Sequence, residues 1–546
     1  MKVLCLFLLS FTLGFFAVSA ENIRIIPQPK EMVETNDNFL LDSRLFIVSG
    51  VESQSTALIL REYFACEYGL KLELKSLATE KEKCIRFTLK RNLPSEGYEL
   101  NVNANCVEIS ASDNTGWFYA IQSLKQLLPP NDGVSAVNDI SIPGVSIKDS
   151  PRFPWRAFML DESRYFKGAD QVKMLLDEMA SLKMNIFHWH LVDDQGWRIE
   201  IKKYPLLTEI GSKRESTQVG PLKWESPIQS GETHEGYYTQ DEIKEIINYA
   251  AQRHITIVPE IEMPGHSSAA IASYPWLGTA KDEIEVPIRF GVGTDVYDLS
   301  DPKVYQFLTD VLDEVIELFP SMVIHIGGDE VKYDHWKQSL SVQAYMNENN
   351  LETPADLQVY FTNSISRYLQ GKGRRMMGWN EILGHNLHEY QDEADTQVKQ
   401  KLARQTVIHF WKGDVELISQ AASEGYEIVN SLHSYTYLDY DYVDIPLQKA
   451  YSFNPIPEEL DSRYHDKVIG MGCQMWGEWI PTNGYMHFMV FPRIAAYAEV
   501  GWTQIENKNF GEFERALKKM KMHWDKIGVY YAPDSVVGIE SEDNEK

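Results

Sequence analysis

The chain has 546 residues, of which 44% are hydrophobic and 24% charged, a balance typical of a globular protein with an extensive core. Its formal net charge of −27 argues against nucleic acid and anionic membranes as partners, because both require a basic surface. Aromatic residues make up 12% of the chain, which provides flat apolar faces that suit sugar rings.

The first 20 residues have the layout of a cleavable secretory signal. A single lysine precedes an apolar stretch, and small residues at Ala17, Ser19 and Ala20 form the expected cleavage site. We therefore expect an exported protein, periplasmic or extracellular, whose mature part begins at Glu21. No later stretch approaches the ~18 consecutive apolar residues that span a bilayer, so we expect no membrane anchor.

Residues 21–148 are expected to form a small α+β domain. Short β-rich runs such as RLFIVSG alternate there with helical stretches such as STALILREYFACEYG. The segment SIPGVSIKDSPRFPWR, with its prolines and polar turns, is the expected boundary.

Residues 149–505 are expected to form an α/β domain, a (β/α)8 TIM barrel, because apolar runs alternate with amphipathic helical stretches. Residues 506–546 are expected to add a C-terminal helix and an acidic tail. The eight expected strands are 156–161, 185–191, 255–262, 322–330, 374–381, 406–411, 426–431 and 468–476.

Polar and aromatic side chains follow the ends of these strands, where such a barrel carries its chemistry. Arginine and carboxylates supply paired donors and acceptors for sugar hydroxyls, and indoles supply faces for sugar rings. The pattern therefore indicates an acidic, tryptophan-walled pocket for carbohydrate. The candidates in chain order are Arg164, His190, Asp193, Asp194, Glu260, Glu262, His266, Asp329, Glu330, Trp379, Trp411, Tyr437, Asp439, Trp476 and Glu478.

Asp329 and Glu330 end the run VIHIGGDE, in which two glycines admit a tight turn close to a ligand. Two adjacent carboxylates repel each other, so one of them is expected to hold its proton near neutral pH, as a general acid must. An isolated Asp-Glu pair would more simply be a solvated turn. The other polar strand ends favour a functional site here.

A metal site is the weaker alternative. His188 and His190 lie two residues apart on one strand and share a face, a spacing also seen in metal-binding barrels. No complete ligand set accompanies them, so we expect no metal and no cofactor. We interpret both histidines as groups that orient Asp193 or Asp194, and the choice between these two aspartates stays open.

The chain resembles family 20 glycoside hydrolases, the β-N-acetylhexosaminidases, from Ile25 to about Trp502. The early region resembles the non-catalytic α+β domain of that family. The motifs that carry the resemblance are MLDESRYF, FHWHLVDDQGWRIEI, GYYTQDEI, VPEIEMPGH, HIGGDE, MMGWNEI, YLDY and QMWGEW.

The resemblance implies a retaining mechanism in which the substrate supplies its own nucleophile, the 2-acetamido oxygen, and passes through an oxazolinium intermediate. Glu330 would protonate the leaving oxygen and later activate water. Asp329 would accept a hydrogen bond from the acetamido N–H, and Tyr437 would hold the acetamido oxygen. On this view Asp329 stays ionised and raises the proton affinity of Glu330.

The resemblance also implies exo-action on terminal GlcNAc or GalNAc residues of oligosaccharides or glycoconjugates. A non-catalytic sugar-binding protein on the same scaffold is the alternative, and the sequence does not fix the oligomeric state. Arg164, Asp439 and Glu478 would bind ring hydroxyls, and Trp379, Trp411 and Trp476 would line the sugar. Asp193 or Asp194, with His266 and His190, would support Glu330.

Overall fold

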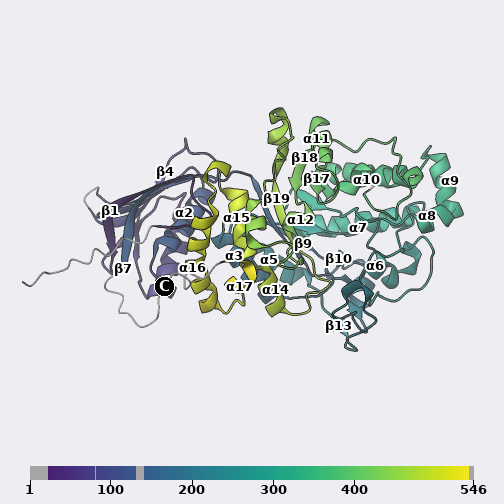
Figure 1. Cartoon of the computed structure of the whole chain (residues 1–546), viewed down its shortest axis with the longest axis horizontal. Helices are drawn as coiled ribbons and strands as arrows, with labels where there is room; N and C mark the ends of the chain where they lie inside the picture. The colour runs from purple at the N-terminus through teal and green to yellow at the C-terminus, as the bar shows by residue number, and fades with distance from the viewer. Residues whose placement is uncertain (1–22, 80–81, 131–139, 386, 540–546) are drawn as a thin grey trace, which may run out of the picture.

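The computed structural model describes residues 23–79, 82–130, 140–385 and 387–539. The expected signal segment, 1–20, and the expected acidic tail, 540–546, lie outside these described residues. Within them the chain forms a seven-stranded sheet followed by a closed eight-stranded barrel, arranged along the long axis of the molecule (Figure 1). None of the helices in the described ranges is long and apolar enough to cross a membrane.

The N-terminal sheet has the strand order β1-β7-β5-β6-β4-β2-β3, and helices α1 (Gln54–Tyr68) and α2 (Asn114–Leu127) pack against it. Residues 141–149, which we assigned to a boundary segment, instead form most of β7. Their alternating buried positions let this stretch pair with both β1 and β5. The strands are β1 (Glu31–Leu41), β2 (Phe46–Val48), β3 (Glu73–Lys75), β4 (Cys84–Leu89), β5 (Tyr98–Val102), β6 (Cys106–Ala111) and β7 (Ile140–Asp149).

The barrel consists of parallel strands and closes where β19 pairs with β8, so the expected (β/α)8 architecture is confirmed. Each expected strand corresponds to one observed strand. They are β8 (Trp155–Asp161), β9 (Ile186–His190), β14 (Thr256–Glu260), β15 (Val323–His325), β16 (Arg375–Trp379), β17 (Val407–Phe410), β18 (Glu427–Asn430) and β19 (Val468–Met475).

Helices surround the barrel, and their ends follow local capping rules: Thr239 and Glu242 form a capping box on α5, and Asp301 caps α7 ahead of Pro302.

Four two-residue strands lie in the loops: β10 (Val192–Asp193), β11 (Gly196–Trp197), β12 (Lys213–Arg214) and β13 (His234–Glu235). The helices are α3 (Ala169–Ser181), α4 (Leu206–Glu209), α5 (Gln240–Ala251), α6 (Ser268–Ser273), α7 (Pro302–Leu318), α8 (Asp334–Gln338), α9 (Leu340–Glu348), α10 (Pro354–Gly371), α11 (Glu416–Ser423), α12 (His433–Thr436), α13 (Leu447–Ser452), α14 (Asn483–Val490), α15 (Arg493–Trp502), α16 (Phe510–Ile527) and α17 (Asp534–Val537).

The barrel interior changes from apolar to polar along the strands. A small apolar cluster fills its lower part and includes Ile186, Val258, Val323, Val407 and Val429. Because alternate residues of a strand share a face, the next inward position lies two residues further on. Those positions carry His188, Glu260, His325, His409 and Ser431, all buried. The sequence period therefore places a polar layer directly above the apolar one.

The fourth strand is shorter than expected, because β15 ends at His325 rather than continuing to Glu330. Gly327 and Gly328 then adopt left-handed φ values of 65° and 88°. A Cβ atom on Gly327 would lie 1.6 Å from Glu262 Oε2, so only glycine fits under that carboxyl group. The chain thus leaves the strand to pass over Glu262 before it reaches the Asp329–Glu330 pair.

The sheet and the barrel are joined through Asp149, the last residue of β7. Its carboxylate lies 3.1 Å from Lys183 Nζ, and it accepts hydrogen bonds from the Tyr98 hydroxyl at 2.7 Å and the Trp502 indole at 3.0 Å. Helix α16 lies between the two parts (Figure 1), and the Trp524 indole donates to Glu178 of α3 at 2.8 Å. The orientation of the N-terminal sheet on the barrel therefore depends on a buried ion pair.

Asp149→Asn is expected to lower the free energy of unfolding by about 3–5 kcal/mol, because the fully buried Lys183 ammonium loses its counter-charge. Thermal and urea unfolding would measure this loss. Glu352→Gln, which removes one partner of an exposed pair with Lys399, is the matched control and should change little. Similar stabilities for the two variants would contradict the role of Asp149.

Candidate active site

Arg164 marks one end of the pocket and is held by carboxylates. Its guanidinium lies 2.7 Å from Asp193, 3.1 Å from Asp161 and 3.7 Å from Glu478. Burial alone would lower the pKa of Arg164, but the charges of Asp193, Glu478 and Asp161 outweigh it and raise this pKa well above its usual value. Arg164 is therefore a fixed, charged donor beside Glu478.

Asp439 completes this end of the pocket with Glu478. Burial, together with the charge of Glu478, raises the pKa of Asp439 well above its usual value. Its Oδ1 atom is buried and accepts no hydrogen bond from any residue that the structure describes. This end of the pocket thus combines a charged donor with carboxyl oxygens that are available to a polar ligand.

The expected aromatic residues form a wall next to Arg164. Trp379, Tyr437 and Trp476 pack in one cluster with Met159, and Trp411 lies at its edge. The rings of Trp411 and Tyr437 are nearly parallel, at 9°, and Trp379 and Trp476 lie 5.9 Å apart between ring centroids. All four residues are brought together as expected from their strand ends.

Asp329 and Glu330 lie beside this wall in different surroundings. Asp329 is buried, and its Oδ1 has no hydrogen-bond partner in the described part of the chain. The side chain of Glu330 keeps 25% of its surface exposed, and its backbone has a left-handed φ of 52°. A non-glycine residue in that region is strained, and such strain is common at functional sites.

The pKa shifts of the pair run opposite to the expected protonation, in which Asp329 is charged and Glu330 holds the proton. Burial, together with the carboxylates of Glu381, Glu260 and Glu330, raises the pKa of Asp329 to about 8 despite the nearby charge of His266. Burial would also raise the pKa of Glu330, but His266, by hydrogen bonding and charge, lowers it below its usual value. The surroundings of the pair therefore disfavour the charge of Asp329 and favour that of Glu330.

His266 links both acids to the aspartates of the second strand. Its Nε2 lies 3.7 Å from an oxygen of Asp329 and from one of Glu330. Its Nδ1 lies 3.1 Å from Asp193 and 3.2 Å from Asp194. The sequence left open which of the two aspartates supports the acid, and in the structure both contact His266. Burial would lower the pKa of His266, but Asp193 outweighs it and raises the pKa well above its usual value.

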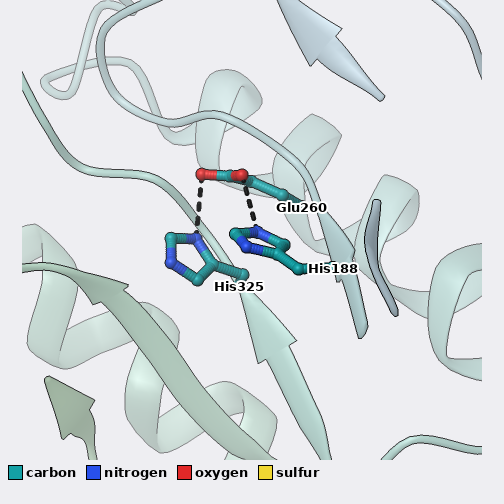
Figure 2. Close-up of side chains that lie close together, drawn as sticks. All are labelled: His188, Glu260 and His325. Carbon is teal, nitrogen blue, oxygen red and sulfur yellow. Dashed lines mark ion pairs between the residues drawn. The ribbon is translucent and has the colours of Figure 1, made fainter. Parts of the chain in front are cut away.

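Glu260 is a buried centre of this network. It accepts hydrogen bonds from the Trp379 indole at 2.8 Å and from His190 at 2.6 Å, while His188 and His325 face its carboxylate at 2.8 and 2.9 Å (Figure 2). His190 also contacts Asp193 at 3.0 Å, as we expected. His188 does not orient either aspartate, because its imidazole points to Glu260 instead.

The His188–Glu260–His325 cluster could hold a metal ion only after rearranging. Zinc bonds of about 2.0–2.1 Å require ligand atoms that lie roughly 3.4 Å apart in a tetrahedron. The facing nitrogen and oxygen atoms here are already in direct contact at 2.8 and 2.9 Å. Burial also lowers the pKa of His188 to about 4, so its imidazole is neutral, and its Nε2 makes no hydrogen bond to any residue in the described ranges.

We therefore expect prolonged treatment with EDTA to leave kcat/KM unchanged within about twofold, because the nitrogen and oxygen atoms of this cluster already contact one another directly. The measurement is hydrolysis of a chromogenic glycoside before and after dialysis against the chelator. A loss of activity that added zinc restores would identify the cluster as a metal site.

Sequence reasoning missed His388, Tyr390 and Lys412, which lie around Glu330. His388 Nδ1 is 3.8 Å from Glu330 Oε1, and Lys412 Nζ is 3.2 Å from the same imidazole nitrogen. Lys412 directly follows the predicted Trp411, but His388 and Tyr390 lie in an irregular segment that carries no periodic signal. Only the position of that segment after the fifth strand indicated that it reaches the pocket.

Family models match most of the chain. Glycosyl hydrolase family 20, catalytic domain, matches residues 153–505, and domain 2 of the same family matches residues 22–150. A β-hexosaminidase of Porphyromonas gingivalis is 36% identical over 94% of this chain, and one of Vibrio furnissii is 36% identical over 75% of it. The alignments span 64% and 66% of those two relatives, so this chain corresponds to only part of their length.

Solved structures show the same architecture. A family 20 exo-β-N-acetylglucosaminidase of Vibrio harveyi, in complex with N-acetylglucosamine, superposes with a TM-score of 0.79 at 30% identity, covering 94% of this chain and 80% of that one. A β-N-acetylhexosaminidase of Bacteroides fragilis gives 0.76 at 28% identity, covering 94% and 97%. The likeness therefore extends over both the N-terminal sheet and the barrel.

Proposed function

The chain belongs to glycosyl hydrolase family 20, and from that premise we propose that it is an exo-acting, retaining β-N-acetylhexosaminidase that uses the acetamido group of its substrate as the nucleophile. It is a glycoside hydrolase of the barrel class. We propose terminal GlcNAc or GalNAc residues as the substrates of this enzyme.

The observation that carries the proposal is the unequal pair Asp329 and Glu330. Asp329 offers a buried oxygen that lacks a donor, which suits the N–H of an acetamido group. Glu330 is more open and can reach a leaving oxygen as general acid, then activate water as general base. The two acids are neighbours in the chain rather than facing partners across a sugar, which supports a nucleophile supplied by the substrate.

The remaining residues fit an N-acetylated sugar. Tyr437, parallel to Trp411 and close to Asp329, would donate to the acetamido oxygen while the indoles enclose the methyl group. Arg164, Asp439 and Glu478 would bind the ring hydroxyls at the far end. The ion pairs with Asp161 and Asp193 fix Arg164 at that end, which suits the recognition of a terminal residue.

Three chromogenic glycosides test this function: the N-acetyl-β-glucosaminide, the N-acetyl-β-galactosaminide and the β-glucoside, which lacks the acetamido group. We expect the first two to be hydrolysed and the third to react at least about 1,000-fold more slowly, because an intramolecular nucleophile is lost. Binding of GlcNAc without hydrolysis of any glycoside would instead identify a sugar-binding protein.

A further inference from the structure

Four side chains lie around Glu330 on the side away from His266: Lys332, His388, Tyr390 and Lys412. We call them the basic flank. The two oxygens of Glu330 face different imidazoles, because Oε2 lies 3.7 Å from His266 and Oε1 lies 3.8 Å from His388. Lys332 follows Glu330 closely in the chain, and the other members come from the segments after β16 and β17.

Contacts with the pocket wall hold the basic flank in place. Glu381 accepts hydrogen bonds from the Trp411 indole at 2.9 Å and from His388 Nε2 at 3.0 Å. Lys412 Nζ lies 3.2 Å from Nδ1 of the same His388 imidazole. On its other side His388 stacks on Tyr390 at 5.0 Å and 15°.

The two ammonium groups of the basic flank form no close ion pair with a described residue. Lys332 Nζ lies 3.2 Å from the centre of the Tyr390 ring, and Lys412 Nζ contacts His388. Neither lysine has a carboxylate within 4.0 Å among the residues that the structure describes. The chain as a whole is acidic, with 79 acidic and 52 basic residues. The two lysines therefore give this side of Glu330 a positive charge that differs from the net charge of the chain.

The basic flank lies where a leaving group would be. Arg164 and Glu478 mark the end for ring hydroxyls, and Asp329 marks the acetamido side, so the face of Glu330 toward the basic flank is the one left for the departing sugar. Tyr390 is 42% exposed, which opens this side to solvent. Burial and the carboxylates of Glu330 and Glu381 raise the pKa of the Tyr390 phenol, consistent with a hydroxyl close to Glu330.

We propose that the basic flank recognises a leaving-group sugar that carries an anionic substituent, with Lys332 and Lys412 as its charge partners. The inference rests on the proposed hydrolase function and adds a substrate class to it. A lysine ammonium attracts an anion as a point charge, so both carboxylate and sulfate substituents belong to this class.

Two disaccharides that differ in one group test the proposal: GlcNAc-β1,4-glucuronic acid and GlcNAc-β1,4-glucose. We expect the intact protein to prefer the acidic one by about tenfold in kcat/KM, and the preference to shrink between about 0.01 M and about 1 M salt. The double variant Lys332→Met/Lys412→Met should lose the preference. Because both kcat/KM values are measured on the same variant, their ratio cancels any effect of the substitutions on Glu330 itself.

Lys303→Met, an exposed charge change at the start of α7, is the matched control and should keep the wild-type ratio. Equal rates on both disaccharides in the wild type, or a preference that survives the double variant, would overturn the inference while leaving the hydrolase function intact. Failure to hydrolyse either disaccharide or an aryl glycoside would refute the proposed function itself. A third substrate with 6-sulfoglucose as leaving group tells carboxylate from sulfate, and a preference for either supports the proposal.

Discussion

Glu330→Gln is expected to lower kcat/KM for chitobiose by about 1,000-fold or more, because a sugar alkoxide cannot leave without a proton and glutamine cannot supply one. A p-nitrophenyl glycoside has a leaving group that needs little protonation. Its cleavage should therefore fall far less in the same variant. Steady-state kinetics on both substrates measures the difference, and the ratio of the two losses identifies the general acid.

Glu348→Gln on α9 is a suitable control, since that carboxyl group is exposed and remote from the pocket. Equal losses on the two substrates would show that Glu330 supports the site in some way other than protonating the leaving oxygen. Wild-type activity on chitobiose would remove it from the mechanism.

Asp329→Asn is expected to lower kcat by about 100- to 1,000-fold on both good and poor leaving groups, because a charge that stabilises the cationic intermediate is lost. The change in KM should be small. The raised pKa of Asp329 means that this carboxyl group is neutral before a ligand binds, and asparagine resembles that form in shape and charge. The loss should therefore appear in kcat rather than in binding.

Asp466→Asn, at an exposed position before β19, provides the matched control for removing one carboxylate. A defect of Asp329→Asn confined to poor leaving groups would assign it the role of acid instead. A large rise in KM with normal kcat would mean that Asp329 only binds the sugar.

The position of the proton suggests how binding prepares the site. A bound acetamido N–H would donate to Asp329 and favour its charged form, while the leaving group would cover the open side of Glu330 and disfavour its charge. Both effects move the single proton of the pair from Asp329 to Glu330. Because neighbouring buried carboxyl groups influence one another's titration, the pH dependence of kcat/KM reports the group of acids rather than one residue.

The barrel was predictable from the sequence because its strands are buried on both faces and read as apolar runs. The two-residue period correctly placed His188 and His190 on one face, but it did not indicate that both histidines meet Glu260. The end of the fourth strand was not predictable, since the turn at Gly327 depends on Glu262 from another strand. His388 was missed for a similar reason: the path of an irregular segment is set by packing rather than by a repeating pattern.

The protonation of Asp329 and Glu330 could also not be predicted from the sequence. Adjacency alone indicated that Asp329 and Glu330 interact, but which of them is neutral depends on His266, His388 and Lys412, which come from three other strand ends. The sequence likewise left both aspartates of the second strand as candidates. Their shared contact with His266 appears only in three dimensions.

The central claim is that the substrate supplies the nucleophile, and the most direct test replaces the acetamido methyl hydrogens with fluorine one at a time in an aryl glycoside. Each fluorine weakens the carbonyl oxygen as a nucleophile while changing its size little. We expect a steep, regular fall in kcat across the acetyl, fluoroacetyl, difluoroacetyl and trifluoroacetyl series. A flat series would contradict it and require a nucleophile from the protein or from water.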